Sequence, residues 1–233
     1  MKRRIRKGKL MDILNQLASD LFKHLQAMDG EANSSAGYCF HAGLNNYSIY
    51  KGLSGKKYEN SWNDRLAELL GNNGNTTSRE FRYPDSKKKC DIVIKSNNGK
   101  SIWLEVKSAW KYWFSSTSGK LEKNSPQIYR SYLLGNSANT LNKTHSVVQD
   151  IEKLSLLDSN LADYIGLLII GFDIQEDPID PDMEELIKTM NLKEQGWKVF
   201  GPEIWLDRNH PDCRYNCWFL GKKSVYFDNN SIR

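Results

Sequence analysis

Residues 89–107, KCDIVIKSNNGKSIWLEVK, decide the fold because they predict two strands joined by a tight turn. The strands are expected at 89–95 and 101–107, which are rich in β-branched and other apolar residues and are separated by a turn signal. Between them, Asn-Asn-Gly at 97–99 is typical of a three-residue hairpin loop, because glycine adopts the left-handed conformation that such a loop needs. An antiparallel hairpin is therefore predicted.

The loop length also predicts the register of the hairpin. A three-residue loop makes Ser96 face Lys100, and each strand then advances in step with the other. Counting back from that pair places Asp91 directly opposite Glu105. Two carboxyl groups are thus expected to be cross-strand neighbours.

The alternation of side chains assigns each residue of the hairpin to a face. Glu105 and Lys107 share one face with Asp91. The other face collects the apolar residues of both strands: Ile92, Ile94, Ile102, Leu104 and Val106. Carboxylates about 5 Å apart are destabilising unless a positive charge lies between them, and Mg²⁺ prefers such oxygen ligands. We therefore expect a divalent metal at Asp91 and Glu105, with Lys107 orienting or deprotonating an attacking water.

The elements around the hairpin predict an α/β fold with a mixed central sheet flanked by helices. Helical periodicity or capping residues indicate helices at 10–28, 62–70, 125–134, 144–156 and 180–194. A further strand is expected at 77–83, a buried central strand at 167–170, and short strand-like pieces with turns after residue 194. We expect residues 1–60 to form a basic arm and an N-terminal helical extension, and 61–233 the main domain, within one compact unit.

Asp91, the hairpin turn and Glu105-Val106-Lys107, in this order of elements from about residue 61 to 172, resemble the PD-(D/E)XK, or restriction-endonuclease-like, nucleases. The position before Asp91 is Cys90 where that family often has proline. The resemblance implies a restriction-endonuclease-like core, catalytic Mg²⁺ bound by Asp91 and Glu105, and Lys107 assisting the nucleophilic water. Mn²⁺ is expected to substitute for Mg²⁺.

Two further residues enter the site through the same resemblance. Many members carry an acidic residue on the helix before the sheet, and Glu68 holds the matching place, either as a metal ligand or as a solvated side chain, with Glu80 as its substitute. Gln149 and Lys153 are similar to a Gln-x-x-x-Lys pattern of some branches, although a solvated polar pair on a helix explains them equally well. Gln149 is kept as a secondary site residue.

Composition and charge fit a protein that acts on nucleic acid. The net charge of the chain is +5, and many of its basic residues are clustered at the N-terminus and at 87–89. Such clusters suit a polyanionic partner, although the N-terminal cluster also suits a solvated arm. No apolar run is long enough to cross a bilayer, so we expect a cytoplasmic protein with reduced cysteines. His210, Cys213 and Cys217 form only an incomplete zinc pattern, even with Cys39 and His41.

These observations predict an Mg²⁺-dependent DNA endonuclease of the restriction or defence type. A homodimer is one arrangement that would suit it, since two related sites most simply cut two antiparallel strands. A DNA repair or junction-processing nuclease, and a non-catalytic DNA-binding protein with a nuclease-like fold, remain as alternatives. The recognition sequence, the cleavage position and an RNA substrate are open at this point.

Overall fold

A computed structural model describes residues 12–32, 58–84, 86–114, 120–135, 146–207 and 211–225. The helices are α1 (Ile13–Ala32), α2 (Tyr58–Gly71), α3 (Pro126–Leu134), α4 (Val147–Ser155) and α5 (Asp180–Thr189). The strands are β1 (Thr76–Arg82), β2 (Lys89–Lys95), β3 (Ser101–Trp110), β4 (Tyr112–Phe114), β5 (Leu121–Lys123), β6 (Tyr164–Ile174), β7 (Lys198–Leu206) and β8 (Cys213–Lys223).

The main sheet is six-stranded and mixed, in the order β1-β2-β3-β6-β8-β7. The pair β3–β6 is parallel, and every other neighbouring pair is antiparallel. The strands β4 and β5 form a separate two-stranded sheet. The predicted α/β class with a mixed sheet between helices is therefore confirmed.

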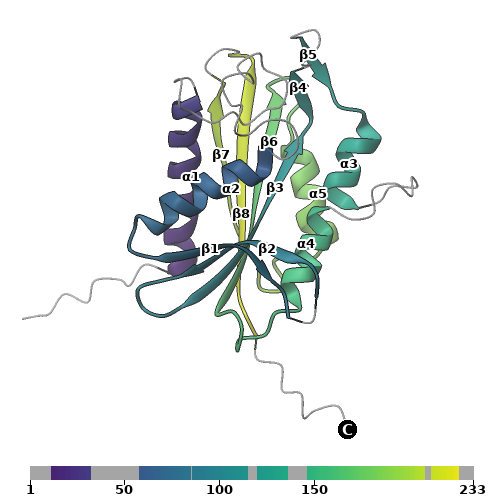
Figure 1. Cartoon of the computed structure of the whole chain (residues 1–233). Helices are drawn as coiled ribbons and strands as arrows, with labels where there is room; N and C mark the ends of the chain where they lie inside the picture. Colours follow the sequence, from purple (N-terminus) through teal and green to yellow (C-terminus); the bar gives the residue numbers. More distant parts are fainter. Residues whose placement is uncertain are drawn as a thin grey trace, which may run out of the picture.

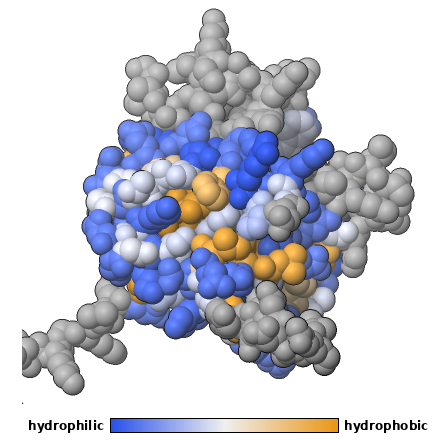
Figure 2. All heavy atoms as spheres, turned by 60° about the horizontal axis from the view of Figure 1, so that its bottom comes forward, coloured by the Kyte–Doolittle hydropathy of each residue, from blue (hydrophilic) through white to orange (hydrophobic). Residues whose placement is uncertain are grey.

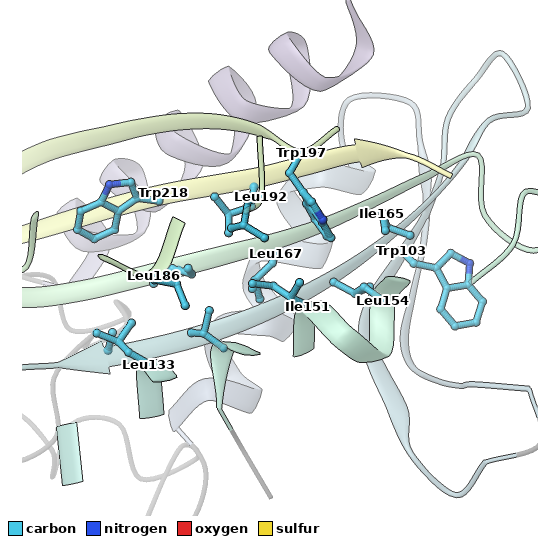
Figure 3. Close-up of a cluster of buried hydrophobic side chains, with 14 of the residues drawn as sticks. Trp103, Leu133, Ile151, Leu154, Ile165, Leu167, Leu186, Leu192, Trp197 and Trp218 are labelled. Atoms are coloured by element: carbon cyan, nitrogen blue, oxygen red, sulfur yellow. The ribbon is translucent and has the colours of Figure 1, made fainter. Parts of the chain in front are cut away.

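Helices cover both faces of this sheet, in three layers (Figure 1). On one face, α1 and α2 pack against apolar side chains of β2, β3, β6 and β8, including the predicted set Ile92, Ile94, Ile102, Leu104 and Val106. On the other face, α3, α4 and α5 bury a second cluster, in which Trp103, Leu167 and Trp218 meet Ile151, Leu154 and Leu186 (Figure 3). Both faces of the central strands are thus buried.

The predicted N-terminal helical extension is integral to the core. Its apolar stripe is confirmed, since Leu14, Leu17, Leu21, Leu25 and Met28 are buried against the sheet; Leu10 lies outside the described residues. Although α1 precedes the predicted boundary at residue 60, it shares one core with β8. Residues 33–57, which separate α1 from α2, are not described.

The C-terminal part of the sheet differs most from the prediction. The segment after residue 194 is predicted as short strand-like pieces with turns, but Lys198–Leu206 and Cys213–Lys223 form the long antiparallel pair β7–β8. Polar residues and Gly201-Pro202 interrupt the apolar pattern, and at this point the register shifts between Phe200 and Glu203. The sheet continues because β8 lies between β6 and β7.

Helix ends were predicted less well than helix positions. The helix predicted at 62–70 begins one turn earlier, at Tyr58, and the one predicted to Glu194 ends at Thr189. The earlier end of the second helix has a structural cause. Asn191 adopts a left-handed φ of 49°, which is incompatible with a continuing right-handed helix. The central strand is longer than predicted, because β6 spans Tyr164–Ile174 with Gly166 and Gly171 inside it.

Candidate active site

The β2–β3 hairpin has the register predicted from its loop. Ser96 donates its backbone N–H to the carbonyl of Lys100 at 2.8 Å, and Gly99 has the expected left-handed φ of 78°. Ile92 pairs with Leu104, so that the preceding residue, Asp91, lies across from Glu105. The two carboxyl groups are therefore brought together as predicted.

The side chain of Asp91 accepts a hydrogen bond that a backbone carbonyl accepts in a regular pair of strands. The paired residues of β2 and β3 end at Ile92 and Leu104, although β3 itself continues to Trp110. Beyond them the backbone N–H of Val106 donates to Asp91 Oδ2 at 2.9 Å, in place of a carbonyl of β2. Asp91 therefore has a defined orientation at the place where the two strands separate.

Glu105 is held by a hydroxyl and an ammonium group. Its side chain is nearly completely buried, at 4% exposure. The Tyr83 hydroxyl donates to Glu105 Oε1 at 2.5 Å, and Lys153 Nζ lies 2.7 Å from the same oxygen. Tyr83 follows β1 and packs its ring against Trp103, whereas Lys153 comes from α4. Two distant parts of the chain thus converge on this carboxyl group.

Burial and the neighbouring carboxyl of Asp91 raise the pKa of Glu105 well above its ordinary value, against the opposing effect of Lys153. Burial alone would lower the pKa of Lys153, but the carboxyl groups of Glu105 and Asp150 outweigh it and raise that pKa. Burial, followed by the charges of Cys90 and Glu105, also raises the pKa of the Tyr83 hydroxyl. The pair Asp91–Glu105 consequently favours an added positive charge or a proton.

Lys107 joins the same network through α4. Its Nζ lies 3.6 Å from Asp150 Oδ2, and Asp150 Oδ1 lies 3.0 Å from Lys153 Nζ. A continuous series of polar contacts therefore runs from Lys107 through Asp150 and Lys153 to Glu105. Together with Asp91, this network contains three carboxyl groups, those of Asp91, Glu105 and Asp150. It also contains the ammonium groups of Lys107 and Lys153.

The sequence of α4 explains why this helix supplies the partners. Val147, Ile151 and Leu154 are buried and attach the helix to the sheet. Asp150 and Lys153, three residues apart, lie on neighbouring positions of the helix surface and reach β3. A capping box at Ser146 and Gln149 fixes the start of the helix, because each side chain binds the other residue's backbone N–H.

One expectation about this face was wrong. The alternation of side chains predicts that the face of Glu105 and Lys107 is the polar side of the hairpin, opposite the core. It is instead covered by α4, and Lys107 is only 8% exposed. The physical reason is that β3 lies between β2 and β6 in the sheet, where helices bury both of its faces.

The remaining predicted site residues lie away from Glu105 or have other contacts. Glu68 lies on α2, in the layer of the opposite sheet face, and its exposed carboxylate pairs with Arg65 at 2.9 Å. Glu80 on β1 pairs with Lys89 at 2.5 Å. Gln149 serves the capping box of α4 and also lines a cavity beside Lys153. The metal and catalytic roles of Glu68 and Gln149 stay predictions.

Sequence reasoning did not assign Tyr83 or Asp150 to the site, and it noted Lys153 only as part of a pattern. The signal for Asp150 and Lys153 was a pair of opposite charges bordering the apolar stripe of a helix, which is equally typical of a solvated surface pair. Tyr83 gave no signal of its own, because its contact with Glu105 joins positions 22 residues apart.

For zinc, Cys213 and Cys217 are buried in the core between the sheet and α1, while His210, Cys39 and His41 lie outside the described residues. Among the described residues, no group of three or more His, Cys, Asp and Glu side chains is gathered closely enough to hold a metal. The described helices also include none that is long and apolar enough to span a membrane.

The fold and the site together define an α/β protein whose mixed sheet carries a buried carboxyl pair and a lysine at the junction of β2, β3 and α4. The chain matches no protein-family model, no curated protein and no solved structure.

Proposed function

We propose that this chain is a Mg²⁺-dependent deoxyribonuclease with a restriction-endonuclease-like core, in which Asp91, Glu105 and Lys107 form the active site. The observation that carries the proposal is the opposed pair of carboxyl groups of Asp91 and Glu105, with the raised pKa of Glu105 and with Lys107 in the same polar network. The order α2-β1-β2-β3-β4-β5-α3-α4-β6 supports it, since it contains the helices and strands on which the family resemblance rests, with the short strands β4 and β5 in addition.

The donor groups at this place fit a hard divalent cation. Both are carboxyl groups, which Mg²⁺ prefers, and Asp91 is partly exposed beside the buried Glu105. A bound Mg²⁺ would polarise a phosphodiester and lower the pKa of its water. Asp91 and Glu105 would hold it, and Mn²⁺ would substitute. Because the described residues bring no third acidic ligand to the pair, waters and a substrate phosphate would complete the coordination.

The other residues of the network would prepare this chemistry. Lys107 would orient the attacking water or neutralise charge at phosphorus, and Asp150 holds its ammonium group in place at 3.6 Å. Tyr83 and Lys153 both contact Glu105 Oε1, which orients that carboxyl group. The exposed residues Lys87 and Lys88 lie between β1 and β2, as Tyr83 does, and the exposed Lys89 begins β2; these lysines would bind DNA phosphates. Within the enzyme class we favour an endonuclease of the restriction or defence type over a repair or junction-processing nuclease; a homodimer of it would cut two antiparallel strands most simply.

A second function is favoured by one contact. Lys153 Nζ lies 2.7 Å from Glu105 Oε1 and supplies a buried positive charge where catalysis would need a metal. A protein that binds DNA through this fold without cutting it would need only this internal ion pair. The two functions differ in their response to Mg²⁺.

The decisive experiment is to incubate the purified protein with plasmid, single-stranded DNA and RNA, with Mg²⁺ or with EDTA, beside the variant Asp91→Asn. The proposed function predicts Mg²⁺-dependent DNA cleavage that Asp91→Asn abolishes. Calorimetry with Mn²⁺ should show binding to the parent and at least tenfold weaker binding to the variant, because one of two charged ligands is lost. If the protein binds DNA but neither cleaves it nor binds Mn²⁺, the second function would be established instead.

A further inference from the structure

A cavity of about 620 Å³ opens directly beside the carboxyl pair. Tyr83 and Lys153 belong to its lining, and both also contact Glu105 Oε1, at 2.5 and 2.7 Å. Tyr83 and Lys153 therefore connect the lining of the cavity to Glu105. A molecule bound in it would lie next to the site that we propose for phosphodiester hydrolysis.

The lining combines apolar walls with cationic groups. Leu156, Leu157 and Leu161 form the apolar part, while Lys88 and Lys153 provide ammonium groups. Leu156 is 82% exposed and Leu161 42% exposed, which places large apolar side chains at the solvent-facing rim. Apolar patches also interrupt the hydrophilic surface at the end of the molecule that is the bottom of Figure 1, as Figure 2 shows.

These features match one nucleotide better than a duplex. A nucleobase has two apolar faces that pack against aliphatic or aromatic side chains, and its phosphate needs a cation. The volume lies within the roughly 300–1,000 Å³ of small-molecule sites. A base inside a continuous duplex is stacked and paired, so it has to leave the stack to enter such a cavity, which costs free energy. An unpaired base avoids that cost.

We propose, on the basis of the proposed function, that this cavity binds one unpaired nucleotide, so that the substrate is DNA containing a single-stranded or extruded nucleotide. The leucines contact the base, while Lys88 and Lys153 contact the adjoining phosphates. Glu152, also in the lining, offers an acceptor for an exocyclic amino group of the base. The backbone that continues from this nucleotide then passes Asp91 and Glu105.

The test measures binding and cleavage separately. Fluorescently labelled duplexes, one fully paired and one with a single bulged nucleotide, are titrated in EDTA, which prevents Mg²⁺-dependent cleavage. The variant Leu156→Glu places a negative charge at the rim without disturbing the core, because Leu156 is 82% exposed. Its matched control is Leu206→Glu on β7, where the leucine is 54% exposed and outside the cavity lining.

The inference predicts tighter binding of the bulged duplex by the parent, and about a tenfold loss of that affinity in Leu156→Glu, the effect of losing one stacked base contact. Leu206→Glu should bind like the parent. Equal binding of the two duplexes, or an equal effect of the two variants, would overturn the inference.

Cleavage assays in Mg²⁺ distinguish failure of the nucleotide-site inference from failure of the proposed nuclease function. If paired and bulged DNA are cut equally and Leu156→Glu changes neither rate, the cavity is not a nucleotide site although the nuclease assignment stands. If no DNA is cut but the Leu156-dependent preference for the bulge persists, the nucleotide site stands and catalysis is refuted. Absence of any DNA binding refutes both.

Discussion

At the residue scale, the central question is what Lys107 does in its buried position. Its aliphatic stem lies in a covered part of the sheet, and its ammonium group lies 3.6 Å from Asp150. Truncation to alanine would therefore leave a cavity as well as remove the charge, and the two effects would be confused. Methionine keeps most of the stem and removes only the ammonium group.

We predict that Lys107→Met abolishes DNA cleavage while Mn²⁺ binding survives, because Asp91 and Glu105 remain. Asp150 keeps its contact with Lys153 at 3.0 Å, so the free energy of unfolding should fall by no more than about 2 kcal/mol. Single-turnover cleavage, calorimetry and thermal unfolding measure the three quantities. A Lys107→Met protein that cuts DNA at close to the parent rate would exclude a catalytic lysine here.

At the element scale, the position of α4 determines the geometry of the site. Ser146 accepts a hydrogen bond from the backbone N–H of Gln149 and so caps the helix that carries Asp150 and Lys153. The helix α3 has a comparable cap, where Ser125 accepts from Ile128. No residue of α3 belongs to the polar network around Glu105, which makes Ser125 a matched control.

We predict that Ser146→Ala and Ser125→Ala each lower the free energy of unfolding by about 1 kcal/mol, the usual cost of losing a cap. Only Ser146→Ala should also slow cleavage, because it loosens the first turn of the helix that positions Lys153 and Asp150. Chemical denaturation and cleavage rates test the pair. Equal cleavage by the two variants would show that α4 does not depend on its cap for positioning.

Asp177 anchors the small β4–β5 sheet to the segment between β6 and α5. It pairs with Lys111 at 2.9 Å and Lys123 at 2.5 Å, and it accepts a hydrogen bond from the Tyr112 hydroxyl at 2.9 Å. Burial alone would raise the pKa of Asp177, but these partners outweigh it and hold the pKa far below its ordinary value of 3.8. The carboxylate is thus stabilised in its charged form.

The sign of the pH dependence follows from this lowered pKa. The stability that Asp177 contributes is fully present above pH 3.8 and is lost as the pH falls below that value. We predict that Asp177→Asn costs about 1 kcal/mol at pH 7 and that the difference from the parent shrinks below about pH 4. Urea unfolding at a series of pH values measures it. The control is Glu184→Gln, at an exposed carboxylate with no ion pair among the described residues. Its difference in unfolding free energy from the parent should not change over the same pH range.

At the scale of the whole molecule, the distribution of charge governs association with DNA. The N-terminal basic residues lie outside the described residues, so their contribution has to be measured in solution: Lys2, Arg3, Arg4, Arg6, Lys7 and Lys9. Neutralised phosphates release counterions, and DNA affinity therefore falls with salt in proportion to the number of contacts, with a slope of about −0.9 for each contact.

Deleting residues 1–9 should reduce the slope of log affinity against log salt, measured by fluorescence anisotropy in EDTA. The exposed Lys193, near the C-terminal end of α5, provides the control, and Lys193→Ala should leave the slope unchanged. If the deletion leaves the slope unchanged as well, the arm contributes to solubility and not to DNA binding.

Local rules determined much of the candidate site. The loop Asn-Asn-Gly at 97–99 and the period-two alternation were enough to place Asp91 across from Glu105, because a hairpin loop and the register of its strands are set by neighbours in sequence. The same holds for the stripe of α1 and for the buried strand β6, whose patterns need no distant partner to be read.

Only the tertiary structure decided what surrounds that pair. Tyr83 and Lys153 meet Glu105 from positions far away in the sequence, and the cover of α4 over Lys107 follows from the parallel pairing of β3 with β6. The strands β7 and β8 likewise form through pairing along the sheet, despite interrupted patterns. Burial and charge at Glu105 are sums over all its neighbours in space, whereas the sequence pattern specifies directly only those neighbours that a hairpin or a helical turn brings close.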